Sequence, residues 1–334
     1  MTITVRFWGV RGSVPTPLTN PALQNKIVRA LQKTYEHPLP ESGETERLAA
    51  WIREHLDFST HSTFGGNTTC LEVRCDGELI ILDMGTGLRG LGGALMPEIF
   101  GKRGIKGSIL QSHVHWDHIQ GFPFWGPLYL PRTAVENHFT FFGGKEWDAQ
   151  LELVLAGQMN TPVFPVSFGE LRHTSMHMEF QTVWDGWSTT LPGPKGPIRI
   201  TARKLNHPQE TFGYRIEYAG QTVAFTTDHE PYAAGIPVPL LALVDKADLW
   251  ITDCQYTHDM YVGKMDKVQR LGWGHSYPAY IAAVAREGLP KRVLTTHHDP
   301  SSSDEAIQRI ASAVADDAKL HTDAAYEGLV VELG

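Results

Sequence analysis

The chain has 334 residues, of which 42% are hydrophobic, and it is therefore long enough to bury a sizeable core in one large domain or two ordinary ones. Its net charge of −8, without any block of Lys and Arg, disfavours nucleic acid as a bulk partner. The three cysteines, Cys70, Cys75 and Cys254, are too few and too scattered for a disulfide framework or a four-cysteine zinc site. We interpret them as buried free thiols.

Residues 2–7 at the N-terminus alternate like a β-strand and do not show a basic region followed by an apolar run. No stretch of about eighteen apolar residues occurs, so a membrane-spanning helix is not expected. These features favour a cytoplasmic protein with no membrane partner.

Runs rich in β-forming residues and segments with helical periodicity follow one another along the chain. The predicted strands are 2–8, 69–75, 78–82, 108–112, 198–204, 212–218, 221–226, 249–252 and 292–296. The predicted helices are 21–35, 44–58, 147–158, 277–286 and 304–314. Strands that first meander and later alternate with helices predict an α+β fold, an αββα sandwich of two mixed β-sheets flanked by helices.

The Pro/Gly-rich segment 191–197 is typical of a loop, and no internal repeat is present. We therefore predict a single domain over residues 1–334. A helical insertion at about 17–63 separates the first two predicted strands. It would form either a cap over a pocket or an association surface, such as a homodimer contact.

The segment 113–118 carries three histidines and one aspartate directly after an apolar run, namely His113, His115, Asp117 and His118. Imidazole and carboxylate groups are ligands that suit zinc, manganese and iron. A loop at a strand end would free the four side chains from strict alternation, so that His113 with His115 could serve one ion and Asp117 with His118 a second. A histidine-rich surface loop or a nucleic-acid contact is the alternative interpretation.

Further polar residues follow other predicted strands: His207 after 198–204, Asp228 after 221–226, and His297 with His298 after 292–296. Taken singly, each is as consistent with a hydrogen-bonded loop residue as with a ligand. Together they favour one active site, because such sites collect on loops that a rigid scaffold holds.

With these residues the chain resembles the metallo-β-lactamase superfamily, whose αββα sandwich carries a metal site at one edge of its two sheets. The resemblance implies that His113, His115 and His207 hold one ion, that Asp117, His118 and His297 hold the other, and that Asp228 lies between them. His298 is the alternative last ligand, since two adjacent residues at a strand end point different ways. Asp83 matches an aspartate that supports the metal loop from beneath.

Within the superfamily, the chain is similar to the phosphodiesterase branch, which includes ribonuclease Z and small cyclic-phosphate phosphodiesterases. Segments 9–15, 65–69 and 274–276 carry this similarity, which implies that His275 faces the scissile phosphate as general acid. Two departures matter. Only twenty residues separate His207 from Asp228, so the long tRNA-binding arm is absent. Phe225 stands where ribonuclease Z has a glutamate that supports the acid histidine, so either another carboxylate does this or His275 works without it.

These residues predict a hydrolase with two divalent metal ions, zinc as the first candidate and manganese as the second. The ions would lower the pKa of a shared water and provide a hydroxide nucleophile. Asp117 would bind metal and orient the water, and His275 would protonate the leaving alkoxide. The expected substrate is a small phosphodiester, such as a cyclic nucleotide or cyclic sugar phosphate.

Three alternative functions fit the same residues. An oxygenase with one iron is disfavoured, because Asp117 and His118 would be ligands of a second ion. A lactone or thioester hydrolase would use the same site with less help for the leaving group. A non-catalytic, metal-containing binding or sensor protein is disfavoured, because a purely structural site closes its coordination with protein groups.

A few other residues have two interpretations each. Arg11 could contact a phosphate, although a structural ion pair is the more common role of such an arginine. Asp253 is expected either to support a site residue or to cap a turn. The aromatic cluster of Trp116, Phe122, Phe124 and Trp125 is expected to be core and pocket wall rather than a base-stacking platform.

Overall fold

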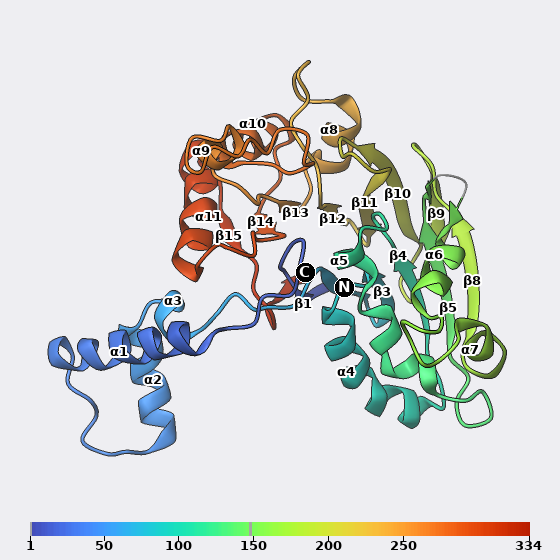
Figure 1. The fold of residues 1–334 in the computed structure, drawn as a ribbon, viewed down its shortest axis with the longest axis horizontal. Coiled ribbons are helices and arrows are strands. Elements are labelled where there is room, and N and C mark those ends of the chain that lie inside the picture. Colours follow the sequence, from blue (N-terminus) through green and yellow to red (C-terminus); the bar gives the residue numbers. More distant parts are fainter. Residues whose placement is uncertain (1, 147–148) are drawn as a thin grey trace.

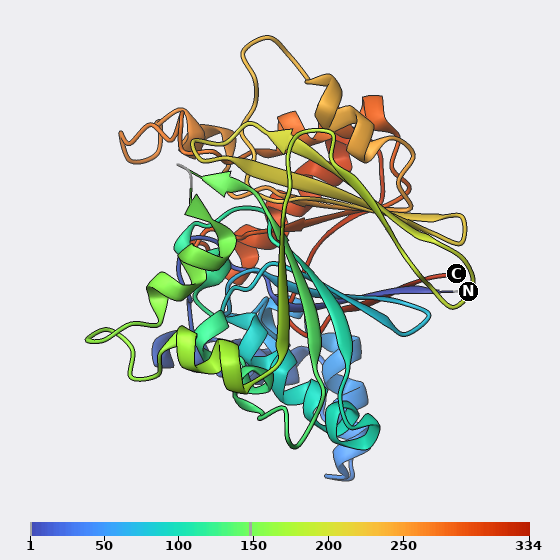
Figure 2. The same cartoon turned by 90° about the vertical axis from the view of Figure 1, so that its right-hand side faces the viewer.

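The computed structural model describes residues 2–146 and 149–334, and it contains two mixed seven-stranded sheets with helices on their outer faces (Figure 1; Figure 2). The strand order is β16-β1-β2-β3-β4-β5-β8 in the first sheet and β15-β14-β13-β12-β11-β10-β9 in the second. This architecture confirms the predicted αββα sandwich.

The first sheet consists of β1 (Ile3–Gly9), β2 (Cys70–Cys75), β3 (Glu78–Leu82), β4 (Lys106–Leu110), β5 (His138–Gly143), β8 (His177–Thr182) and β16 (Val330–Leu333). The second consists of β9 (Ser188–Leu191), β10 (Ile198–Leu205), β11 (Thr211–Tyr218), β12 (Gln221–Thr226), β13 (Leu249–Asp253), β14 (Val293–Thr296) and β15 (Thr322–Ala324). A separate two-stranded sheet pairs β6 (Lys145–Glu146) antiparallel with β7 (Ala149–Gln150).

The α-helices are α1 (Asn20–Glu36), α2 (Thr45–His55), α3 (Phe58–His61), α4 (Gly87–Lys102), α5 (Trp116–Ile119), α6 (Leu151–Gln158), α7 (Phe168–Thr174), α8 (Val238–Val244), α9 (His258–Tyr261), α10 (Pro278–Gly288) and α11 (Asp304–Ala318). Two 3₁₀ helices, η1 (Phe122–Phe124) and η2 (Gly126–Tyr129), follow α5. Helix α6 begins at Leu151, whereas the predicted helix began at 147; residues 147 and 148 lie outside the described residues.

The main core lies between the two sheets. Along β1 the residues Ile3, Val5 and Phe7 are fully buried, because alternate side chains of a strand point to the same face. They share one cluster with Ile200 and Tyr214 of the second sheet. Alternation in the sequence thus determines which face of each strand closes the sandwich.

Helix α4 covers the outer face of the first sheet, although its sequence gave no helical prediction. Its several glycines and Pro97 lower its intrinsic helix propensity. A stripe of leucine and isoleucine side chains at helical spacing is nevertheless buried against the sheet: Leu88, Leu91, Leu95 and Ile99. Burial of this stripe outweighs the weak propensity.

Helices α1, α2 and α3 fall within the segment 17–63 and project from the sandwich beside α11 (Figure 1). Helices α8, α10 and α11 cover the outer face of the second sheet. Within residues 2–146 and 149–334, no helix is both long and apolar enough to span a membrane.

Phe225, in β12, offers a test of the core between the sheets. Its side chain is fully buried, so Phe225→Ala is expected to lower the free energy of unfolding by about 3–5 kcal/mol through lost burial and a residual cavity. Denaturant unfolding followed by circular dichroism measures this change. Phe100→Ala, at a position that is 57% exposed, is the control and should stay within about 0.5 kcal/mol of the parent. If both substitutions changed the free energy of unfolding equally, Phe225 would not be part of the core between the sheets.

Candidate metal centre

Strand direction brings the predicted ligands to one edge of the sandwich. β3 and β4 are parallel, and so are β12, β13 and β14. β10 runs in the same direction as β12, because both are antiparallel to β11. The ligand-bearing segments follow the carboxyl ends of these strands: 113–118 after β4, His207 after β10, Asp228 after β12 and His297 after β14. Carboxyl ends of parallel strands are where open α/β sheets place their sites.

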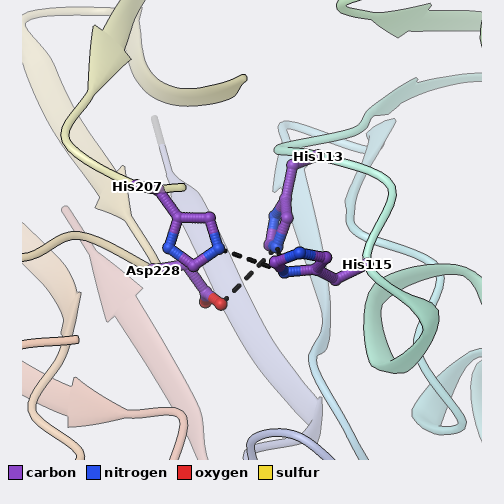
Figure 3. A group of neighbouring side chains, drawn as sticks. All are labelled: His113, His115, His207 and Asp228. Carbon is purple, nitrogen blue, oxygen red and sulfur yellow. Dashed lines mark hydrogen bonds and ion pairs between the residues drawn. The ribbon is translucent and has the colours of Figure 1, made fainter. Parts of the chain in front are cut away.

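The first ligand group consists of His113, His115, His207 and Asp228, whose side chains point toward one another (Figure 3). His115 Nδ1 lies 3.0 Å from His113 Nε2 and 3.1 Å from His207 Nε2. Asp228 Oδ2 lies 3.6 Å from His113 Nε2. Three histidines and one carboxylate therefore surround one point.

The second group consists of Asp117, His118 and His297, all of them buried. The Nε2 atoms of His118 and His297 are 3.2 Å apart, and Asp117 Oδ2 lies 3.2 Å from the first and 3.1 Å from the second. Asp228 also reaches this group, with Oδ2 3.4 Å from His118 Nε2 and Oδ1 3.3 Å from His297 Nε2. Asp228 therefore lies between the two groups.

The donor atoms fit metal ions in number, type and spacing. Ligands about 2.0–2.1 Å from a tetrahedral zinc ion lie about 3.3 Å from one another. The separations within the two groups, from 3.0 to 3.6 Å, agree with that spacing. Imidazole nitrogens that face each other at 3.0–3.2 Å need a cation or a proton between them. The residues present thus fit a site for two ions.

Electrostatics put the histidines of the first group and both carboxylates in suitable protonation states. Burial lowers the pKa of His113 and His115, and lowers that of His207 to about 4, so these imidazoles are neutral as metal binding requires. Burial by itself would raise the pKa of Asp117 and Asp228. The nearby His118 and His297 outweigh burial and hold both pKa values well below the usual range. Both carboxyl groups are therefore ionised. At His118, burial would lower the pKa, but Asp117, Asp228 and Asp83 raise it, so a metal ion there would replace a proton.

Asp83 supports the metal loop from beneath, as the resemblance implied. Its Oδ2 lies 2.8 Å from His118 Nδ1, and its Oδ1 accepts a 2.7 Å hydrogen bond from the backbone N–H of Ser112. Asp83 (φ 61°), Asp228 (φ 52°) and His297 (φ 56°) all adopt the left-handed backbone region. Strained backbone of this kind persists where the surrounding structure holds it, often at functional sites.

The structure separates the two candidates for the last ligand. His297 belongs to the second group, and its Nδ1 lies 3.0 Å from Gln255 Oε1. His298 instead points to the backbone, with Nε2 2.8 Å from the carbonyl oxygen of Ala325. Burial lowers the pKa of His298 to about 3. The supporting role of Gln255 had no signal in the sequence.

His275 lies against a carboxylate that the sequence left undecided. Its Nδ1 is 3.1 Å from Asp253 Oδ2 and 4.0 Å from Asp228 Oδ2. Burial would lower the pKa of His275, but Asp253 and Asp228 together raise it. Asp253 thus takes the supporting place for which Phe225, buried between the sheets, offers no polar atom.

Glu230 organises the loop before His275, a role that sequence reasoning missed. Its Oε1 accepts hydrogen bonds from Tyr261 Oη at 2.7 Å and from the Gly272 N–H at 2.8 Å, and its Oε2 accepts one from the Gly274 N–H at 2.9 Å. The Gly274 carbonyl in turn lies 3.0 Å from His207 Nδ1. The only sequence signal was the position of Glu230 two residues after Asp228.

The opening loop packs on the site, but Arg11 has a structural role there. Its Nε donates to the carbonyl of Gly65 at 2.8 Å, and its Nη1 donates to the carbonyls of Asp299 and Ser302 at 3.1 Å. The guanidinium is buried, and the structural interpretation therefore holds rather than the phosphate contact. Two residues later, the Ser13 N–H donates to Asp117 Oδ2 at 2.8 Å.

The aromatic cluster beside the metal loop divides into two parts. Phe122 and Trp125 are fully buried core residues. Trp116 and Phe124 are 73% and 61% exposed, so neither is core. Trp116 stands between His115 and Asp117 and thus lies beside both ligand groups.

The geometry defines a buried site for two metal ions at the edge of an αββα sandwich. Residues 80–298 match the family described as "Beta-lactamase superfamily domain". The chain therefore belongs to the β-lactamase superfamily, and it is a metallo-β-lactamase-fold hydrolase with a His/Asp binuclear site.

Solved structures extend the likeness in fold over the whole chain. The chain is similar to the metallo-β-lactamase-fold protein YhfI from Bacillus subtilis, with 15% identity, a TM-score of 0.61 and 99% of both chains covered. It is also similar to a diphosphatase from the PhnP family, with 17% identity, a TM-score of 0.58 and coverage of 99% of this chain and 98% of that one. The short form of human tRNase Z has 17% identity and a TM-score of 0.55, with 98% of each chain covered. No curated protein sequence matches the chain.

Gly274→Ala is expected to reduce metal occupancy of the first group. A Cβ at this position would overlap with the His207 ring, and φ there is +86°. Metal analysis after dialysis at limiting free zinc should show a loss of metal. Gly77→Ala is the matched control, since φ is +104° but no atom lies within 4 Å of the added Cβ. If both variants retained the metal content of the parent, His207 would not be a ligand held by this loop.

Asp83→Asn is expected to weaken metal binding roughly 10- to 100-fold, since carboxylates that orient ligating histidines typically contribute this much. Zinc titration in competition with a chromogenic chelator measures the affinity, and circular dichroism checks the fold. Asp323→Asn, which removes a partly exposed carboxylate paired with Arg292, should leave the affinity unchanged. An unchanged affinity in Asp83→Asn would argue against the supporting role.

Proposed function

We propose that the chain is a phosphodiesterase of the phosphodiesterase branch, acting on a small phosphodiester such as a cyclic nucleotide or a cyclic sugar phosphate. The observation that carries this proposal is the position of His275, a histidine held by Asp253 beside both ligand groups. Zinc is the first candidate metal because the donors are mainly imidazoles, and manganese is the second.

Two divalent ions in this site would supply a water of lowered pKa and positive charge for the phosphoryl oxygens. The side chains of the protein set the geometry around them. Asp117 accepts the Ser13 N–H, which fixes its carboxylate. The same oxygen, Oδ2, faces the second group, and Oδ1 is then the atom that would orient an attacking water. Asp228 is fixed on the other side by Thr227, whose hydroxyl donates to Oδ1 at 2.6 Å.

His275 provides for the leaving group. Hydrolysis of a phosphodiester adds water to phosphorus and breaks one P–O bond, and the departing alkoxide needs a proton. The Nδ1 atom of His275 faces Asp253, so the proton that the ring can transfer is the one on Nε2. A carboxylate partner of this kind fixes the tautomer and orientation of the imidazole.

Several features support a small substrate rather than tRNA. The residues between His207 and Asp228 form β11 and β12, which are joined by a short turn at 219–220. The net charge of −8 offers no general attraction for a polyanion. Trp116 and Trp273 are 73% and 50% exposed and adjoin the ligand segments, where they offer apolar contacts to an organic group.

His275→Ala tests the proposal. On a cyclic nucleotide, whose leaving group is a poor one, kcat is expected to fall about 10²- to 10⁴-fold. On bis(p-nitrophenyl) phosphate, whose leaving group needs little protonation, the loss should be less than about tenfold. Asp253→Asn should show the same substrate dependence with a smaller loss. His258→Ala, at an exposed position, is the control and should match the parent.

Metal analysis of the same variants separates a proton donor from a ligand, because the side chains of Asp228, His275 and His297 also lie within ligand distance of one another. An unchanged metal content in His275→Ala is the expected result. Activity confined to lactones or thioesters in a screen of the metal-loaded protein would exclude the phosphodiesterase and favour the alternative hydrolase.

A further inference from the structure

Helix α1 exposes a stripe of large apolar side chains. Leu23, Ile27, Leu31 and Tyr35 recur at every fourth residue and are 47%, 51%, 58% and 91% exposed, and Val28, beside them, is 51% exposed. We call these five residues the α1 stripe. Figure 1 shows α1 standing out from the sandwich rather than lying on it. Contiguous exposed apolar surface of this kind on a soluble domain typically marks an interaction site.

The opposite face of α1 is tied to the body of the protein. Lys26 is buried and donates to Asp304 Oδ2 at 2.6 Å and to the Ser62 carbonyl at 2.8 Å. One turn later, Arg29 pairs with Glu305 at the start of α11. These contacts hold α1 in place and leave Leu23, Ile27, Leu31 and Tyr35 exposed to solvent. A helix that is already ordered loses little conformational entropy when a partner binds.

The charges of α1 select the kind of partner. The charged residues of α1 are Lys26, Arg29, Lys33 and Glu36. Lys26 and Arg29 pair with residues of α11, and Lys33 pairs with Glu36 at the end of the helix. The stripe is bordered instead by Gln24, Gln32 and Thr34. An acidic or basic partner would therefore gain no charge pairing on this face. A second copy of the same face would meet no like-charge repulsion across a two-fold axis.

The spacing of the stripe fits self-association as well. Side chains four residues apart form the i±4 ridge of a helix, and two such ridges interdigitate at a crossing angle of about −50°. A two-fold axis through the crossing brings two identical ridges together without any other element. We propose that the α1 stripe is a homodimer contact in which α1 of one copy packs across α1 of the other.

The size of this contact sets the expected strength. A 17-residue helix is about 25 Å long, and a crossed pair buries less than the roughly 800 Å² per partner of a standard interface. The dimer is accordingly expected to dissociate on dilution in the micromolar range. This contact is independent of the proposed reaction, because it involves none of the ligand residues.

Sedimentation velocity of the full chain between about 1 and 100 µM tests the proposal. The parent protein should shift from the 37.2 kDa monomer to twice that mass as its concentration rises. The double variant I27E/L31E places like charges across the axis and should remain monomeric over this range. V163E/V238E adds the same charges at positions that are 76% and 77% exposed elsewhere, and it should dimerise like the parent.

A charge-swap experiment shows whether the stripe meets itself. I27K/L31K alone should also be monomeric, whereas an equimolar mixture of I27E/L31E and I27K/L31K should restore the dimer. Circular dichroism confirms that each variant is folded. A parent protein that stays monomeric at 100 µM would overturn the proposal. So would glutamate variants that dimerise as the parent does, or a mixture that remains monomeric.

Discussion

The burial of Asp228 between two groups of histidines is the constraint on which the rest of the structure depends. A buried carboxylate is costly unless positive charge or hydrogen bonds compensate for it. Its oxygens lie 3.3–3.6 Å from imidazole nitrogens of His113, His118 and His297. The first two histidines follow β4 of the first sheet, and His297 follows β14 of the second. Metal ions satisfy this arrangement because they supply positive charge at the points where the donor atoms converge. The loops at this edge of the sandwich are therefore arranged around Asp228.

A second layer of carboxylates keeps the site in position. Asp83 holds the metal loop, Asp253 holds His275, and Glu230 holds the loop whose Gly274 carbonyl faces His207. Each of these carboxylates positions another residue and does not itself belong to the two ligand groups. Donors from backbone, serine and tyrosine converge on these carboxylates and compensate for their burial. Asp253 Oδ1 is the exception, since it has no hydrogen-bond partner among the described residues.

The site and the projecting helices differ in what they bury and what they expose. At the edge of the sheets, polar groups are buried and their geometry is set by strand direction and by left-handed backbone at Asp228 and His297. On α1, apolar side chains are exposed and the helix is held only along one face. The grouped donors of the site all belong to one chain. Helix α1 leaves apolar surface in water, and association with a second chain would remove it.

The sequence by itself determined the donor chemistry and most of the sandwich. Four potential ligands within residues 113–118 and further polar residues at strand ends need no tertiary information, and alternation identified strands such as β1 and β10. Only the tertiary structure separated His297 from His298, paired Asp253 with His275, turned Arg11 to backbone carbonyls and gave α4 its helix. The physical reason is distance along the chain. Periodicity and ligand type are written in consecutive residues, whereas each of these outcomes depends on packing against groups far away in sequence.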